Sequence, residues 1–138
     1  MGRVVGVDLG SKRVGFALSD PDRIIASAFR MVECRHDREL EAAILAVLAE
    51  TGADLCVIGH PINMNGTRGP AAERAEKIRA ALQLRTPVPL VLWDERLTTK
   101  SAHDVLIEAG TRCEKRKGLV DKIAAQIMLQ HYLDAHGS

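Results

Sequence analysis

The stretch VVGVDLGSKRVGFAL, residues 4–18, places two apolar runs on either side of a short polar turn. Each run is long enough for a buried strand, and Gly10 lies where the chain must reverse, so the pattern predicts a β-hairpin. Asp8 interrupts the first run near its end, and Lys12 and Arg13 follow within the turn. A carboxylate at the end of a buried strand needs partners from elsewhere in the chain, so the rest of the sequence must supply them.

The composition predicts one compact domain over residues 1–138. The chain has a mass of 15.0 kDa, with 46% hydrophobic and 27% charged residues, values at which one core is stable without disulfides. Because the formal net charge is only +1, any attraction to a nucleic acid must come from a local basic patch. Aromatic residues make up 3% of the chain, so we expect recognition of backbone and shape rather than base stacking.

The cysteines exclude two classes of small protein. Cys34, Cys56 and Cys113 are far apart and form no C-x-x-C motif, so neither a disulfide framework nor a zinc knuckle is indicated. Cys56 lies in an apolar run and is expected in the core. The sequence opens with no signal peptide and contains no apolar stretch of about 18 residues, so we expect no membrane partner and a cytoplasmic location.

Apolar periodicity predicts the remaining elements. Strands are expected over 3–9, 14–18, 24–32, 55–59 and 88–93, and a basic, mobile loop over 111–118. Helices are expected to begin with a cap at Asp37, with Pro70 in the first turn, at Thr98 or Thr99, and near Val120. The apolar residues that mark the first, third and fourth helices are Leu40, Ala43, Ile44, Val47, Leu48, Ala102, Val105, Leu106, Ala109, Val120, Ile123, Ala124 and Ile127. On the second helix, Ala71, Ala75, Ile78 and Leu82 are expected to face inward. This order predicts an α/β fold with a mixed five-stranded sheet flanked by helices on both sides.

Carboxylates gather where the predicted strands end. Asp8 ends the first strand, Asp94 and Glu95 end the last one, and Asp121 lies in the first turn of the final helix. If they converge, divalent cations must offset their repulsion, and oxygen ligands favour Mg²⁺ or Mn²⁺. Strand alternation admits only one of Asp94 and Glu95 to such a site, and the pattern does not choose between them. Each acid also has a structural reading, as a turn residue, a backbone partner or a helix N-terminal charge.

Cations and polar groups flank these acids. They are candidates for phosphate contact, because Arg offers paired donors and Lys a point charge; each could equally belong to a solvated loop. The candidate substrate-binding residues are Lys12, Arg13, Asn65, Thr67, Arg68, Arg96, Thr98, Lys100, Lys115, Arg116 and Lys117, with Arg112 beside the last three. His60 precedes the polar loop 61–69, and we expect it to hold that loop rather than contact a substrate.

Four motifs together resemble the YqgF family, whose members are described as nucleases of pre-16S ribosomal RNA and as homologues of Holliday-junction resolvases. The motifs are GVDLGSKRVGFALSD, VIGHPINMNGTRGP, WDERLTTKSA and LVDKIAAQIMLQ, in this order over nearly the whole chain. The resemblance implies a ribonuclease-H-like fold and a metal site made by Asp8, Glu95 rather than Asp94, and Asp121. The family usually has an apolar residue where this chain has His60.

The favoured function is therefore a metal-dependent endonuclease that processes the 5′ end of precursor 16S rRNA, as the resemblance implies. Three alternatives remain: a Holliday-junction resolvase acting on DNA, which would need a symmetric dimer for paired cuts; a nucleotide-dependent phosphotransferase; and a nucleic-acid-binding module without catalysis. The expected partner is structured RNA or a DNA junction. The sequence leaves open whether the protein is a monomer or a homodimer.

Overall fold

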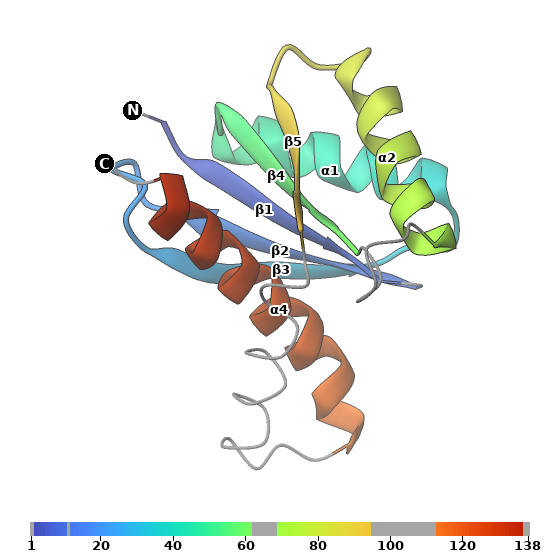
Figure 1. Ribbon diagram of the computed structural model, residues 1–138. Helices are drawn as coiled ribbons and strands as arrows, with labels where there is room; N and C mark the ends of the chain where they lie inside the picture. Colours follow the sequence, from blue (N-terminus) through green and yellow to red (C-terminus); the bar gives the residue numbers. More distant parts are fainter. Residues whose placement is uncertain (1, 11, 62–68, 95–112, 137–138) are drawn as a thin grey trace.

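The chain folds around one five-stranded sheet with the strand order β3-β2-β1-β4-β5 (Figure 1). The computed structural model describes residues 2–10, 12–61, 69–94 and 113–136. The strands are β1 Val4–Leu9, β2 Arg13–Ser19, β3 Ala26–Glu33, β4 Leu55–His60 and β5 Leu90–Asp94. β1, β2 and β3 pair antiparallel, whereas β1, β4 and β5 pair parallel. The predicted mixed five-stranded sheet is confirmed.

Helices cover both faces of this sheet (Figure 1). Helices α1, Asp37–Thr51, and α2, Pro70–Gln83, lie on one face, and α4, Cys113–His136, lies on the other. None of the described helices combines the length and the hydropathy needed to cross a bilayer. The two layers of helix make two separate apolar interfaces with the strands, one on each face.

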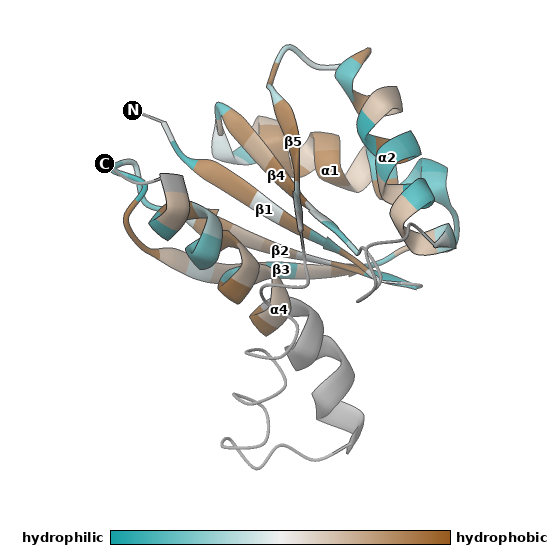
Figure 2. Cartoon of the chain, viewed as in Figure 1, coloured by the Kyte–Doolittle hydropathy of each residue, from teal (hydrophilic) through white to brown (hydrophobic). Residues whose placement is uncertain are grey.

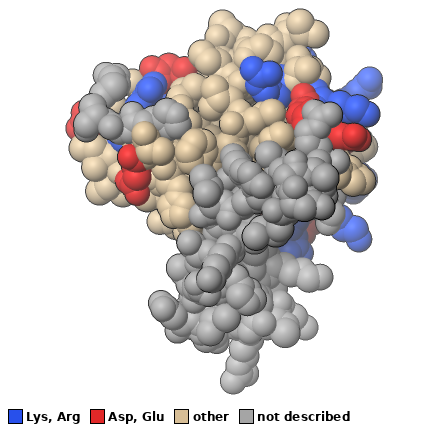
Figure 3. All heavy atoms as spheres, in the orientation of Figure 1, with Lys and Arg blue, Asp and Glu red and all other residues tan. Residues whose placement is uncertain are grey.

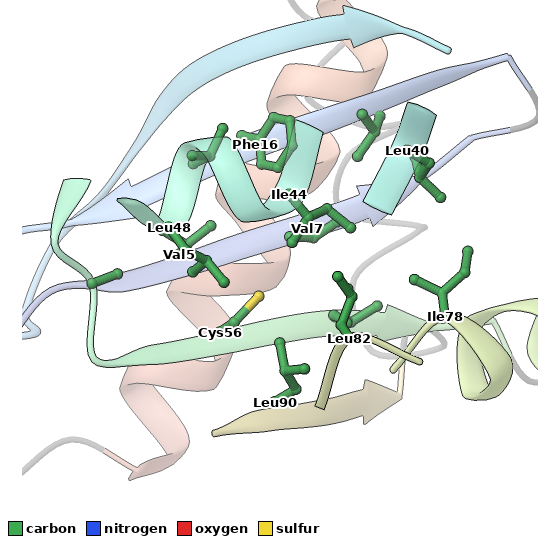
Figure 4. Packing of buried hydrophobic residues seen from close by; sticks show 14 of the residues in the cluster. Val5, Val7, Phe16, Leu40, Ile44, Leu48, Cys56, Ile78, Leu82 and Leu90 are labelled. Atoms are coloured by element: carbon green, nitrogen blue, oxygen red, sulfur yellow. The ribbon is translucent and has the colours of Figure 1, made fainter. Parts of the chain in front are cut away.

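The α1/α2 face buries large side chains. Phe16 of β2, Ile44 of α1 and Leu82 of α2 are fully buried and belong to one cluster (Figure 4). Cys56 lies in the same cluster with no exposed surface, which confirms the prediction of a core thiol. In Figure 2 the strands β1 and β4 are largely brown, while α2 alternates between teal and brown residues, the pattern expected of a helix with one buried face.

On the other face, α4 approaches β1 closely at Gly6. A Cβ atom at Gly6 would lie 2.9 Å from the Cβ atom of Leu129 and 3.4 Å from the carbonyl oxygen of Ala125. Only glycine fits at this point without moving the helix, because real Cβ atoms do not approach so closely. The last helix therefore comes close to β1 at Ala125.

Two sequence predictions about helices are wrong by one residue. His36, not Asp37, is the N-cap of α1, because its Nδ1 atom accepts a hydrogen bond from the backbone N–H of Glu39 at 3.3 Å. Ala72 rather than Ala71 is buried on α2. Ala71 and Ala72 are chemically identical, so periodicity does not choose between them.

The third strand also starts later than expected. It begins at Ala26, and Ile24 and Ile25 are 62% and 61% exposed. The Asp20 carboxylate accepts hydrogen bonds from the backbone N–H groups of Ile24 and Ile25 at 2.7 and 3.0 Å. These bonds close a turn that keeps both isoleucines out of the ladder, despite their high strand propensity.

The basic segment predicted as a loop over 111–118 is helical from Cys113 onward. Glu114, Lys115, Arg116 and Lys117 are good helix formers, and their intrinsic preference outweighs the single Gly118, which costs about 1 kcal/mol in a helix interior. The clustered charge suggested a loop, but charge density does not oppose a helix. The helix expected to start at Thr98 or Thr99 lies outside the described residues.

Candidate active site

Asp8 lies at the carboxyl end of β1, where the parallel strands β4 and β5 also end. Reactive side chains concentrate at such edges, because the loops that leave the strands start there. The carboxyl ends of β1, β4 and β5 lie at one edge of the sheet because these strands pair parallel. The site is therefore built outward from Asp8.

The side chain of Asp8 is on the face of the sheet that α4 covers. Val5 and Val7 pack in the cluster beneath α1 and α2, whereas Val4 packs in the cluster beneath α4. Because successive side chains on a strand alternate between faces, Gly6 and Asp8 share the face of Val4. The carboxylate is half-buried at the open end of this face.

Both neighbours of Asp8 in the sheet are glycines. Gly15 is its partner on β2. On the other side Val7 pairs with Ile58, so Gly59, the next residue of β4, is level with Asp8. Neither neighbour has a side chain to cover the carboxylate, and within the described part of the chain no hydrogen bond or ion pair engages it. A half-buried carboxylate in this state is suited to a cationic ligand, since an unpaired charge away from water is unfavourable.

The register of α4 relates Asp121 to this end of the sheet. The C-terminal end of α4 lies near the start of β1 (Figure 1), and the helix passes Gly6 at Ala125 and Leu129. Since the helix runs back along β1, residue 121 lies one turn, about 6 Å, from Ala125 in the direction of Asp8. The described atoms place the backbone of residue 121 in α4 and do not include its side chain.

The cations in the β1–β2 turn differ from each other. Lys12 is exposed, whereas Arg13 is half-buried and its Nε atom lies 3.8 Å from the Glu33 carboxylate on β3. Lys and Arg side chains are most numerous on the right-hand side of Figure 3, the side on which the β1–β2 turn lies in Figure 1. Lys12 is thus available to an anion, while Arg13 already has a partner.

Most other predicted site residues lie outside the described residues: Asn65, Thr67 and Arg68 in segment 62–68, and Glu95, Arg96, Thr98, Lys100 and Arg112 in segment 95–112. The structure gives Lys115, Arg116 and Lys117 a helical backbone, without their side chains. Asp94 ends β5, where it pairs with His60 of β4. Among the described residues no group of three His, Cys, Asp or Glu side chains could hold a metal ion.

His60 belongs to the opposite face of the sheet. Its Nε2 atom lies 2.7 Å from a carboxylate oxygen of Glu76 on α2. The expected holding of the polar loop 61–69 is not tested directly, because residues 62–68 lie outside the described part. The pair joins the end of β4 to the helix that follows this loop.

Neither described cysteine is a nucleophile. Burial raises the pKa of the Cys56 thiol to about 12, and burial is also the main cause that raises the pKa of Cys34. Because thiolates, not thiols, attack, these groups stay inert near neutral pH.

One contact near the site was not predicted from sequence. Arg74 of α2 donates a hydrogen bond to the carbonyl oxygen of Gly10, two residues after Asp8. Arg74 falls on a helix with many charges and within no predicted motif, so no signal in the sequence points to this contact.

Comparisons with known proteins identify relatives of this chain. The family model described as "RuvX: Holliday junction resolvase" matches residues 2–135. A protein of Lachnospira eligens named "Putative pre-16S rRNA nuclease" is 41% identical over 136 residues, covering 96% of this chain and 97% of that protein. A protein of Geobacillus kaustophilus with the same name is 42% identical, covering 96% and 98%.

Solved structures share the fold. Thermus thermophilus RuvC in complex with a Holliday junction substrate matches with a TM-score of 0.63 at 16% identity, covering 99% of this chain and 96% of that one. The Fowlpox virus resolvase in complex with Holliday junction DNA matches with a TM-score of 0.59 at 14% identity, covering 99% of each chain. The ribonuclease-H-like fold expected from the sequence motifs is confirmed.

Proposed function

Because this chain belongs to the RuvX family of Holliday junction resolvases, and is thus a nuclease that acts on phosphodiester bonds, we propose that it is a metal-dependent endonuclease that processes the 5′ end of precursor 16S rRNA. The observation that carries the proposal is the Asp8 carboxylate, half-buried at the end of β1 between Gly15 and Gly59. An acid in this place would repel a phosphate unless a cation lay between them. A carboxylate at this position is therefore unfavourable for a surface that only binds phosphate.

We propose Asp8, Glu95 and Asp121 as the ligands of Mg²⁺ or Mn²⁺. Trp93 packs in the cluster beneath α4, on the face of Asp8. If β5 continues, alternation brings residue 95, not residue 94, onto the same face, which supports Glu95 over Asp94. The antiparallel course of α4 along β1 supports Asp121 as the third ligand. Oxygen-only donors match the preferences of these hard cations.

The chemistry divides between the ions and the chain. When bound, the divalent ions supply an activated water and stabilise charge on the leaving oxygen. Asp8 fixes the position of the site relative to β1, and its glycine neighbours leave room above the sheet for a sugar–phosphate backbone. Lys12 holds a phosphate by charge, and Arg13, Asn65, Thr67, Arg68, Arg96, Thr98, Lys100, Lys115, Arg116 and Lys117 are the remaining proposed contacts to the nucleic acid.

The substrate, partner and location are part of the proposal. The names of the Lachnospira and Geobacillus relatives support precursor rRNA, and the family description supports four-way DNA junctions as the second candidate. Paired cuts in a junction need a symmetric dimer, whereas cleavage of an RNA end is open to a monomer. Ribosomal RNA processing places the protein in the cytoplasm.

The test compares two single-charge variants, Asp8→Asn and Asp22→Asn. Asp22 is exposed in the turn between β2 and β3, at the other end of the sheet, so it is a matched control. With Mg²⁺ or Mn²⁺ and a 5′-extended 16S rRNA fragment, Asp8→Asn should lower the cleavage rate by roughly 100-fold or more, the scale for loss of a group that stabilises transition-state charge. Asp22→Asn should cleave like the wild type.

Equal cleavage by wild type and Asp8→Asn would reject the assignment of the site. A labelled four-way DNA junction is assayed in parallel. Cleavage of the junction alone, by a dimeric form of the protein, would replace rRNA processing with junction resolution while leaving the site in place.

A further inference from the structure

One arginine of α2 joins the turn after Asp8 to the start of α1. The Nη1 atom of Arg74 donates a hydrogen bond to the carbonyl oxygen of Gly10 at 2.7 Å. Its Nε atom donates another to the Oδ1 atom of Asp37 at 2.9 Å. The side chain of Arg74 is 28% exposed and that of Asp37 is 54% exposed. The guanidinium fork thus holds two acceptors from different elements at once, which only arginine does with fixed geometry.

Three carbonyl groups in or next to the β1–β2 turn accept hydrogen bonds that hold the turn in place. The backbone N–H of Gly10 donates to the Arg13 carbonyl at 2.7 Å, and the N–H of Cys34 donates to the Lys12 carbonyl at 2.9 Å. The first bond lies within the hairpin, and the second comes from the segment just after the neighbouring strand β3. The third, at Gly10, comes from Arg74, 64 residues away in sequence. Arg74 is therefore the described tether that ties this turn to the helical layer.

Arg74 itself is held firmly. Its neighbours on α2 include Ala75 and Ile78, which are buried against the sheet, so the helix cannot shift without losing core contacts. The charge of Arg74 is already balanced by Asp37. A guanidinium satisfied in this way is suited to hold backbone in place rather than to receive a phosphate from solvent.

We propose that Arg74 is a positioning residue for the reaction: it fixes the β1–β2 turn, and with it the orientation of Asp8 and Lys12 toward the nucleic acid. This inference rests on the proposed function, in which Asp8 is a metal ligand and Lys12 a phosphate contact. A loosened turn leaves both side chains present but misplaced. Small misplacements of reacting groups lower rates strongly.

The main experiment uses Arg74→Met, which keeps an unbranched apolar stem and removes every donor. The matched control is Arg85→Met, because Arg85 follows α2 and also pairs with α1, through Glu41 at 3.4 Å, and within the described part of the chain its side chain makes no bond to the β1–β2 turn. At saturating Mg²⁺, Arg74→Met should lower kcat by about 10- to 100-fold, the range seen when supporting residues around a metal site are removed. KM should change by no more than about twofold, because Lys12 is one of many proposed phosphate contacts and the others do not depend on this turn. Arg85→Met should keep the wild-type kcat.

Arg74→Lys adds a rescue test, because its ammonium can still donate to the Gly10 carbonyl. It should recover part of the kcat lost in Arg74→Met. If Arg74→Met has the wild-type kcat, or if Arg74→Lys is no better than Arg74→Met, Arg74 has only a structural role and the inference is overturned.

Amide hydrogen exchange separates this inference from the proposed function. The Gly10 N–H should exchange faster in Arg74→Met than in wild type and unchanged in Arg85→Met, whatever the substrate. Unchanged Gly10 exchange in Arg74→Met would overturn the positioning role even if Asp8→Asn is inactive. Conversely, an active Asp8→Asn would reject the metal site, while Gly10 exchange in Arg74→Met would still show whether Arg74 holds the β1–β2 turn.

Discussion

The two faces of the sheet differ in what their packing achieves. Beneath α1 and α2, large side chains such as Phe16 and Ile44 fill the space between helices and strands. Beneath α4, Gly6, Ala17 and Ala125 let the helix backbone come close to β1. The first face holds the fold together mainly through buried apolar area. The second sets the distance of one helix from one strand, and Asp8 lies at the open end of that strand.

This difference suggests a division of labour between stability and site geometry. A change on the α1/α2 face should lower the free energy of unfolding and leave the chemistry intact. A change on the α4 face should affect both, because α4 carries Asp121. The following predictions test this division, beginning with the largest expected effect.

Ile44→Ala and Leu129→Ala form the strongest test, because both side chains are fully buried, on opposite faces of the sheet. Each should lower the free energy of unfolding by about 2–5 kcal/mol, through lost burial and a residual cavity. Only Leu129→Ala should also lower kcat, by about 10-fold or more, because α4 shifts relative to Asp8. Urea unfolding and cleavage assays well below the melting temperature measure the two effects. An equal loss of kcat in both variants would show that the α4 face does not affect catalysis more than the α1/α2 face does.

Gly6→Ala should have a smaller effect on stability. The new Cβ would lie 2.9 Å from the Cβ of Leu129, so α4 must move, at a cost of roughly 1–3 kcal/mol for overpacking. The double variant Gly6→Ala/Leu129→Gly should be less destabilised than the sum of the two single variants, because removing the Cβ atom of residue 129 relieves the contact. Strict additivity in urea unfolding would show that Gly6 and Leu129 do not share this contact.

Much of the fold could be predicted from sequence, because strand alternation and helical periodicity report burial directly. The hairpin of β1 and β2, the parallel strands and the position of Asp8 at a strand end all follow from residues 4–18 and 55–59. The start of β3 did not follow, because it depends on the Asp20 carboxylate binding two backbone N–H groups. Strand propensity favoured Ile24 and Ile25, and local turn chemistry prevailed.

The candidate site was predictable only in part. The carboxylate at the end of the first strand can be recognised in the sequence. That Gly15 and Gly59 lie on either side of Asp8 depends on strand order and register, which no local pattern encodes. The tether from Arg74 to Gly10 spans 64 residues and involves a backbone carbonyl, so no residue type marks it.

The smallest expected effect concerns the turn between β2 and β3, which begins at Asp20. Backbone N–H groups of Ile25 and Ile24 donate to the Asp20 carboxylate and lower its pKa. A carboxylate with a lowered folded-state pKa contributes stability above its ordinary value, near pH 4, and loses it as pH falls through the folded-state pKa. The loss of stability of the wild type between pH 5 and pH 2.5 should therefore be slightly greater than that of Asp20→Asn. Asp22→Asn, the exposed neighbour, should follow the wild type in urea unfolding; if Asp20→Asn does so too, Asp20 does not act in this way.

Binding of Mn²⁺, followed by electron paramagnetic resonance of the free ion, tests most directly whether the α4 face holds hard cations through Asp8. Wild type and Ile44→Ala should bind Mn²⁺ with the same affinity, because the α1/α2 face takes no part. Asp8→Asn should bind at least about 10-fold more weakly, since even supporting residues change metal affinity by this amount. An Asp8→Asn protein that binds Mn²⁺ as tightly as the wild type would contradict the account.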